Sequence, residues 1–221
     1  MRIGARFNGP DGSANGGWTA GLLAGLLDAP TARVTLRVPP PLETDLAVRA
    51  EGAGIAVYAD EARVAEAVAA DAVVEAVPAV DPDTAAAAAR RYPGHTDHPF
   101  PRCFVCGTAR PAGDGLGIFP GPVGDGRVAA PFAVGAEVTP PLVWAALDCP
   151  GGWSVIAPGR PYVLGRITTT VHALPRPGTT AVVVAHCDTT EGRKAHVRSS
   201  LYTAEGSLLG ASRATWIAVA G

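Results

Sequence analysis

Residues 15–24 (NGGWTAGLLA) and 139–148 (TPPLVWAALD) decide the fold, because each stretch opens an apolar helix and the two share one layout. Both begin with a residue type that caps helix starts, an Asn in the first and a Thr in the second. Nine positions later stand Ala24 and Asp148, respectively. This shared register indicates an internal duplication. Only the first stretch has glycines at its helix start, and only the second ends in an acid.

Segments that favour β-structure surround both helices. We expect strands at residues 33–38, 43–51, 54–58, about 62–76, 116–119, 127–132, 162–173, 179–190, 194–203 and 208–219. Between the halves, residues 83–91 favour a helix, and Pro93, Pro99 and Pro101 prevent regular structure after it. The predicted organisation is an N-terminal unit over residues 1–80, a linker over 81–102 and a C-terminal unit over 103–221.

The composition excludes several classes of protein. The chain has 221 residues, of which 48% are hydrophobic and 17% charged, so it can bury a large core. A formal charge of -2 argues against a nucleic-acid-binding surface or a basic membrane-binding patch. The N-terminus has no signal-peptide core and no run is long enough to span a membrane, so we expect a cytoplasmic protein. Its four cysteines are then thiols or metal ligands.

Residues 103–107 (CFVCG), followed by Gly115 and Leu116, are similar to the opening of single-domain hotdog acyl-CoA thioesterases. Residues 200–212 (SLYTAEGSLLGAS) resemble the C-terminal hairpin of double-hotdog acyl-CoA thioesterases. This resemblance implies an α+β protein made of two hotdog folds in tandem. Each fold is an antiparallel sheet wrapped around a central helix, and the active site lies where the two units meet.

The resemblance also implies roles for the two helix starts. Backbone N–H groups of Gly16 and Gly17 would stabilise a thioester carbonyl as it becomes an oxyanion, and Asn15 would add a side-chain donor. Asp148 would serve as general base or as nucleophile, and the sequence does not choose between these two. We therefore expect the acyl carbonyl to lie between Gly17 and Asp148. Pro150 is expected to end or kink the helix, so that the helix dipole raises the pKa of Asp148.

The duplicated second site lacks the same groups. Pro140 and Pro141 have no N–H to donate, and Ala24 stands where the acid would be, so one composite site is predicted and not two.

Further site residues are carried over from the family. Thr168, chosen from the run 168–170, is expected to orient the attacking water, and Trp18 and Thr215 are expected to contact the substrate.

A metal site is the alternative use of the cysteines. The spacing of His95, His98, Cys103 and Cys106 could bind zinc tetrahedrally. However, the ligand loops are tight and the family motif carries no metal, so we expect no metal and no cofactor, with the cysteine pair packed under a turn.

The functional hypothesis is an acyl-CoA thioesterase that hydrolyses its thioester at one composite site between the hotdog halves. The alternative is a non-catalytic acyl-CoA or lipid-binding hotdog protein. The expected partner is acyl-CoA or a related thioester, with no nucleic acid and no membrane span. The resemblance also allows a homodimer of double hotdogs.

Overall fold

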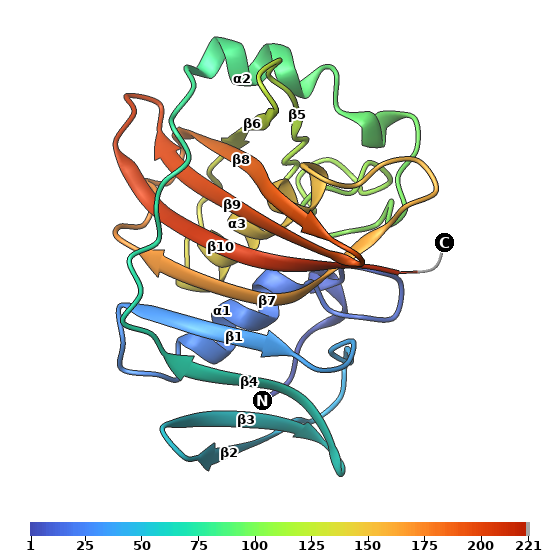
Figure 1. Ribbon diagram of the computed structural model, residues 1–221, viewed down its shortest axis with the longest axis vertical. Helices are drawn as coiled ribbons and strands as arrows, with labels where there is room; N and C mark the ends of the chain where they lie inside the picture. Colours follow the sequence, from blue (N-terminus) through green and yellow to red (C-terminus); the bar gives the residue numbers. More distant parts are fainter. Residues whose placement is uncertain (220–221) are drawn as a thin grey trace.

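The computed structural model describes residues 1–219 and contains one strongly curved antiparallel sheet that wraps two central helices (Figure 1). The strand order is β2-β3-β4-β1-β7-β10-β9-β8-β6-β5. The strands are β1 (Thr31–Leu36), β2 (Ala47–Glu51), β3 (Gly54–Ala59), β4 (Ala62–Ala69), β5 (Gly121–Pro122), β6 (Arg127–Ala133), β7 (Tyr162–Val171), β8 (Thr180–Glu191), β9 (Lys194–Thr203) and β10 (Leu208–Ala218). The helices are α1 (Gly16–Ala24), α2 (Pro82–Ala89) and α3 (Pro140–Trp153), with short 3-10 turns at Ala5–Phe7 and Pro93–His95.

The two halves of the chain share this sheet. The first half supplies β2-β3-β4-β1 and the second supplies β7-β10-β9-β8-β6-β5, and the halves join where β1 pairs with β7. Both α1 and α3 pack on the same concave face, whereas α2 lies at the outer end over β6 (Figure 1). Each half thus contributes one central helix and its own part of the sheet, which is the tandem hotdog arrangement expected from the sequence.

Several elements differ from the sequence predictions: the strand expected at 43–51 begins only at Ala47, the short β5 was not expected, and three larger differences follow. The strand expected at about 62–76 ends at Ala69, and residues 70–81 cross the outer face of the sheet instead. That crossing is fixed because the Val77 N–H donates to Ser200 Oγ at 2.9 Å. Residues 116–119 form no strand, since Gly117 has a φ of 62° that interrupts extended backbone. Finally, α3 continues through Pro150 to Trp153.

Helices α1 and α3 cross antiparallel at a contact that only small residues allow. A Cβ added to Gly17 would lie 2.4 Å from the Asp148 Cβ, and one added to Gly21 would lie 2.5 Å from the Pro141 Cα. The start of α1 therefore lies against the last turns of α3, and the start of α3 lies against the later part of α1. This crossing brings Gly17 of α1 beside Asp148 of α3.

Among residues 1–219, no helix combines the length and the apolar character that a membrane crossing requires.

Candidate active site

Asp148 lies at the centre of the helix crossing and is only 2% exposed. The backbone N–H of Gly17 donates to Asp148 Oδ2 at 2.9 Å, and Asn15 Nδ2 lies 3.3 Å from the same oxygen. The other oxygen, Oδ1, is buried without a hydrogen-bond partner within residues 1–219. The structure thus brings together Asn15, Gly17 and Asp148 from the two halves of the chain.

Asn15 connects three parts of this region. Its Oδ1 accepts a hydrogen bond from the Trp18 N–H at 2.8 Å, which caps α1. Its Nδ2 points the other way, toward Asp148 and toward the sulfur atoms of Cys149 at 3.6 Å and Cys103 at 3.9 Å. The cap therefore fixes the orientation of an amide donor against both the acid and the thiols.

Burial raises the pKa of Asp148 to about 7, although the hydrogen bonds from Gly17 and Asn15 act in the opposite direction. The sequence suggested that the helix dipole would raise this pKa. That explanation is wrong, because α3 continues for five residues beyond Asp148 and its C-terminus is not at this carboxyl group. A carboxyl group with a pKa near neutrality can both take up and release a proton at physiological pH.

A cavity of about 500 Å³ opens beside these groups. Its polar lining includes Asn15, Gly16, Asp148 and the cysteines 103, 106 and 149, and its apolar lining includes Phe100, Trp153, Ile156, Leu164 and Trp216. This combination of apolar walls and a few convergent polar groups is typical of small-molecule sites.

Of the two backbone donors expected at this helix start, one is already engaged. Because the Gly17 N–H is bonded to Asp148 and the two backbones are in contact, a substrate carbonyl does not fit between Gly17 and Asp148. Gly16 also lines the cavity, and in the described part of the chain its N–H has no acceptor. The free backbone donor of this helix start is therefore Gly16.

Thr168 and Thr215 lie on the outer face of the sheet. Thr168 was expected to orient the attacking water and Thr215 to contact the substrate, and neither position suits that role. They share a surface depression with Arg33, Arg166 and Arg213, and Thr215 Oγ1 lies 3.4 Å from His196 Nδ1. Neither lines the cavity that contains Asp148.

The inner face carries a row of hydroxyls that sequence reasoning missed. Ser212 pairs with Thr169 on one side and with Ser199 on the other. All three hydroxyls are buried without a partner in the part of the chain that the structure describes. Ser199 Oγ would lie 3.1 Å from a Cβ at Gly151, so the row runs beneath α3. Once the bulge in this strand is known, strand alternation is the signal that places Thr169, and not Thr168, on the inner face.

Trp18 also lies outside the cavity lining. Its ring stacks on Phe7 at a centroid distance of 3.8 Å and meets the edge of Phe104 at 5.5 Å. Trp18 fills the interface between α1 and the 103–107 loop. It does not line the cavity, so the expected contact between Trp18 and the substrate is not seen.

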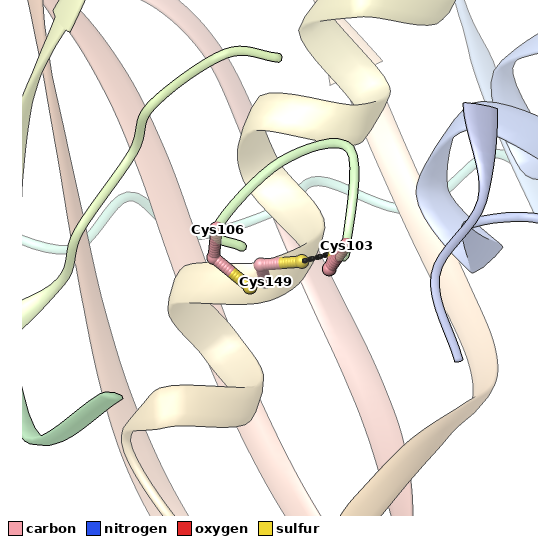
Figure 2. A group of neighbouring side chains, drawn as sticks. All are labelled: Cys103, Cys106 and Cys149. Atoms are coloured by element: carbon pink, nitrogen blue, oxygen red, sulfur yellow. Dashed lines mark hydrogen bonds between the residues drawn. The ribbon is translucent and has the colours of Figure 1, made fainter. Parts of the chain in front are cut away.

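The cysteines gather differently from the zinc alternative considered in the sequence. Cys103, Cys106 and Cys149 are buried, and their three sulfur atoms lie within 4.8 Å of one another (Figure 2). His95 contacts the Ala89 carbonyl at 3.2 Å, and His98 contacts the Cys106 carbonyl at 3.0 Å. The predicted zinc set of two histidines and two cysteines is therefore not assembled. The observed cluster contains Cys149 instead, which the spacing argument did not include.

The three thiols influence one another's ionisation. Hydrogen bonds from the Cys106 and Cys149 thiols lower the pKa of Cys103. Burial raises the pKa of Cys106, and the bond to Cys103 raises that of Cys149. The cluster thus lowers the pKa of Cys103 and raises the pKa of its two neighbours.

Comparison with solved structures identifies the fold. The chain is similar to a candidate thioesterase from Novosphingobium aromaticivorans, with 14% identity, a TM-score of 0.63, and coverage of 98% of this chain and 93% of that one. It is also similar to the tesB protein of Mycobacterium avium subspecies paratuberculosis, with 12% identity, a TM-score of 0.59, and coverage of 99% and 91%. A conserved protein of unknown function with a hot dog fold from Alicyclobacillus acidocaldarius gives 11% identity, a TM-score of 0.54, and coverage of 100% and 92%.

These likenesses cover nearly the whole chain and confirm the predicted tandem hotdog fold. No protein-family model matches the chain. No curated protein matches it in sequence.

Proposed function

We propose that this protein hydrolyses an acyl thioester, with acyl-CoA as the substrate class, at the single composite site formed by α1 and α3. The observation that carries the proposal is the pairing of a buried carboxyl, Asp148, with a free backbone N–H, that of Gly16, on the wall of one apolar cavity. An acid or base and an oxyanion donor are the two groups that acyl transfer to water requires. The name of the Novosphingobium aromaticivorans neighbour, a candidate thioesterase, agrees with this chemistry.

The reaction assigns one step to each group. Asp148 takes a proton from water, the water oxygen adds to the acyl carbon, and the resulting oxyanion accepts a hydrogen bond from the Gly16 N–H. The carbon–sulfur bond then breaks, and the proton held by Asp148 passes to the leaving thiolate. The products are a carboxylic acid and a free thiol. Phe100, Trp153 and Trp216 on the cavity wall suit an apolar acyl chain.

Asp148 as nucleophile is the other route, and isotope labelling separates the two. In a single turnover in H₂¹⁸O, a general base leaves ¹⁸O only in the carboxylic acid. A nucleophilic carboxylate forms an acyl anhydride, which one water then hydrolyses. Where that water attacks the Asp148 carbonyl, ¹⁸O enters Asp148 and the product carries an unlabelled Asp148 oxygen, so ¹⁸O in Asp148 identifies the nucleophilic route. Mass spectrometry of the peptide containing Asp148 gives the answer.

The proposal is tested by incubating the full chain with acyl-CoAs of graded chain length and measuring release of free thiol. We expect hydrolysis of at least one member of the panel with saturation kinetics. Binding of an acyl-CoA in calorimetry without thiol release would contradict hydrolysis. It would instead support the alternative of a non-catalytic acyl-CoA-binding protein. That alternative is favoured by the Gly17 N–H, which donates to Asp148 and is not free to bind an oxyanion.

The hydroxyl row gives a second expected result. We propose that Thr169, whose inward-facing hydroxyl has no partner in the described residues, holds the reacting water, although Thr169 is not in the lining of the cavity beside Asp148. Thr169→Val should then lower kcat by about five- to tenfold, because such a hydrogen bond contributes about 1 to 1.5 kcal/mol. Thr168→Val is the matched control, since it makes the same change one residue away on the outer face, and it should leave kcat unchanged. If Thr168→Val reduced kcat and Thr169→Val did not, Thr168 would be the residue that orients the water, as the sequence suggested.

A further inference from the structure

The cluster of Cys103, Cys106 and Cys149 has the dimensions of a metal site. Cys103 Sγ and Cys149 Sγ lie 3.7 Å apart. The sulfur atoms of a tetrahedral zinc site lie about 3.8 Å apart, because each Zn–S bond is about 2.3 Å long. All three sulfur atoms fall within 4.8 Å of one another, so small rotations of the side chains would bring them to this separation.

The loop that carries two of the cysteines is built to hold them. The Gly107 N–H donates to the Cys103 carbonyl at 2.9 Å and closes a tight turn. A Cβ at Gly107 would lie 2.5 Å from the Cys103 carbonyl oxygen, so only glycine fits there. A Cys-x2-Cys turn of this kind suits a pair of metal-bound thiolates.

The third thiol comes from the other side of the cluster. Cys149 lies on α3, 46 positions along the chain from Cys103, and its turn of helix faces the loop (Figure 2). Asn15 Nδ2 lies 3.6 Å from Cys149 Sγ and 3.9 Å from Cys103 Sγ, which gives the sulfur atoms a side-chain donor. Donors of this kind around a metal site orient its ligands and offset their charge.

The fourth coordination position faces the cavity. All three cysteines line the cavity that Asp148 and Gly16 also line. His98 is close, but its Nε2 contacts the Cys106 carbonyl at 3.0 Å and its Nδ1 accepts the Phe100 N–H at 2.9 Å. Both ring nitrogens of His98 are thus engaged, which leaves water in the cavity as the fourth ligand.

We propose that Cys103, Cys106 and Cys149 bind a thiophilic divalent cation, Zn²⁺ first among them, with the fourth position open to the cavity beside Asn15 and Asp148. Three thiolates and an exchangeable water form a soft, tetrahedral donor set of the type that selects zinc. This proposal does not rest on thioester hydrolysis, and it revises the sequence-based expectation that the cysteine pair only packs under a turn.

The full chain, purified with reductant and given one equivalent of Zn²⁺, should retain about one zinc per chain after gel filtration against a weak chelator. Elemental analysis measures the stoichiometry. X-ray absorption should show three sulfur neighbours at about 2.3 Å and one lighter atom at about 2.0 Å. Cys103→Ser, Cys106→Ser and Cys149→Ser should each remove most of the bound zinc.

Two variants serve as matched controls. Cys187→Ser changes the fourth cysteine of the chain, which lies half-buried on β8 away from the cluster, and it should keep the full zinc content. His98→Gln should also keep it, because His98 is not a ligand in this proposal. Loss of zinc in His98→Gln would show that His98 is the fourth ligand, and would contradict the proposal that the fourth position is open to the cavity.

Because a serine variant can lose metal by failing to fold, the wild-type chain is also loaded with Co²⁺. Thiolate-to-cobalt charge transfer with intense tetrahedral d–d bands is the expected spectrum. Absence of these bands together with absence of zinc retention would overturn the site. So would a chain isolated with a Cys103–Cys149 disulfide that takes up no metal after reduction. None of these measurements depends on activity, so failure here and failure of the proposed hydrolysis are distinguishable.

Discussion

Asp148→Asn should lower kcat by about a hundred- to ten-thousandfold, the range that removal of a positioned general base produces. The change is nearly isosteric, and the Asn Oδ1 can still accept the Gly17 N–H that now lies 2.9 Å from the carboxylate. Folding and the KM for acyl-CoA should therefore stay close to those of the unmodified chain. Steady-state kinetics and circular dichroism measure both.

The control for this prediction uses the equivalent position in the other helix. Ala24 occupies the position in α1 that Asp148 occupies in α3, so Ala24→Asp in the Asp148→Asn background places an acid in the corresponding place. We expect no recovery of turnover, because Pro140 and Pro141 begin the facing helix without an N–H to donate. Full activity in Asp148→Asn, or rescue by Ala24→Asp, would show that the acid has been assigned to the wrong half.

The contact between Gly17 and Asp148 could be predicted because it depends on a register that is visible in the sequence. Position nine of one helix faces the start of the other when two equivalent helices cross antiparallel. The contact of Gly17 with Asp148 has this pattern, whereas the start of α3 meets Gly21 and not Ala24, since Pro141 lies against Gly21. The tandem hotdog fold followed from the same duplication together with the strand-like segments around each helix.

The inward-facing threonine of β7 could not be predicted, because a bulge shifts the alternation of this strand. Arg166 pairs with Thr215 but Leu164 pairs with Trp216, so Gly165 is an extra residue in the ladder. Before the bulge Leu164 faces the core, and after it the core-facing residues are Ile167 and Thr169. Counting every second residue from Leu164 selects Thr168, which is on the outer face. A slip of one residue moves every side chain to the other face of the sheet.

The cysteine cluster could not be predicted for a different reason. Local spacing suggested His95 and His98 as partners of the Cys103 and Cys106 pair, since they are near in sequence. Cys149 is distant in sequence and lies in a helix that Pro150 was expected to end. Because α3 continues through Pro150, Cys149 is held on a regular helical turn and faces the 103–107 loop.

Gly16→Pro should lower kcat by about a hundred- to a thousandfold, which corresponds to loss of one oxyanion donor. Proline removes the N–H of Gly16 and is otherwise suited to this position, because Gly16 is the first residue of α1 and proline is common there. Asn15 also tolerates a following proline, since its φ of -60° and ψ of 132° lie in the extended region. The helix cap should therefore survive the change, and circular dichroism checks that it does.

Gly16→Ala isolates the N–H from the added bulk. A Cβ at position 16 would lie 2.9 Å from Leu164 Cδ2 and 3.1 Å from Leu36 Cδ1, so both variants push against the same leucine side chains, but only proline loses the donor. The ratio of kcat between Gly16→Ala and Gly16→Pro thus measures the hydrogen bond to the developing oxyanion. Equal values of kcat in the two variants would mean that the carbonyl is held elsewhere. In that event, a Gly17 N–H released from Asp148 when substrate binds would become the donor to test.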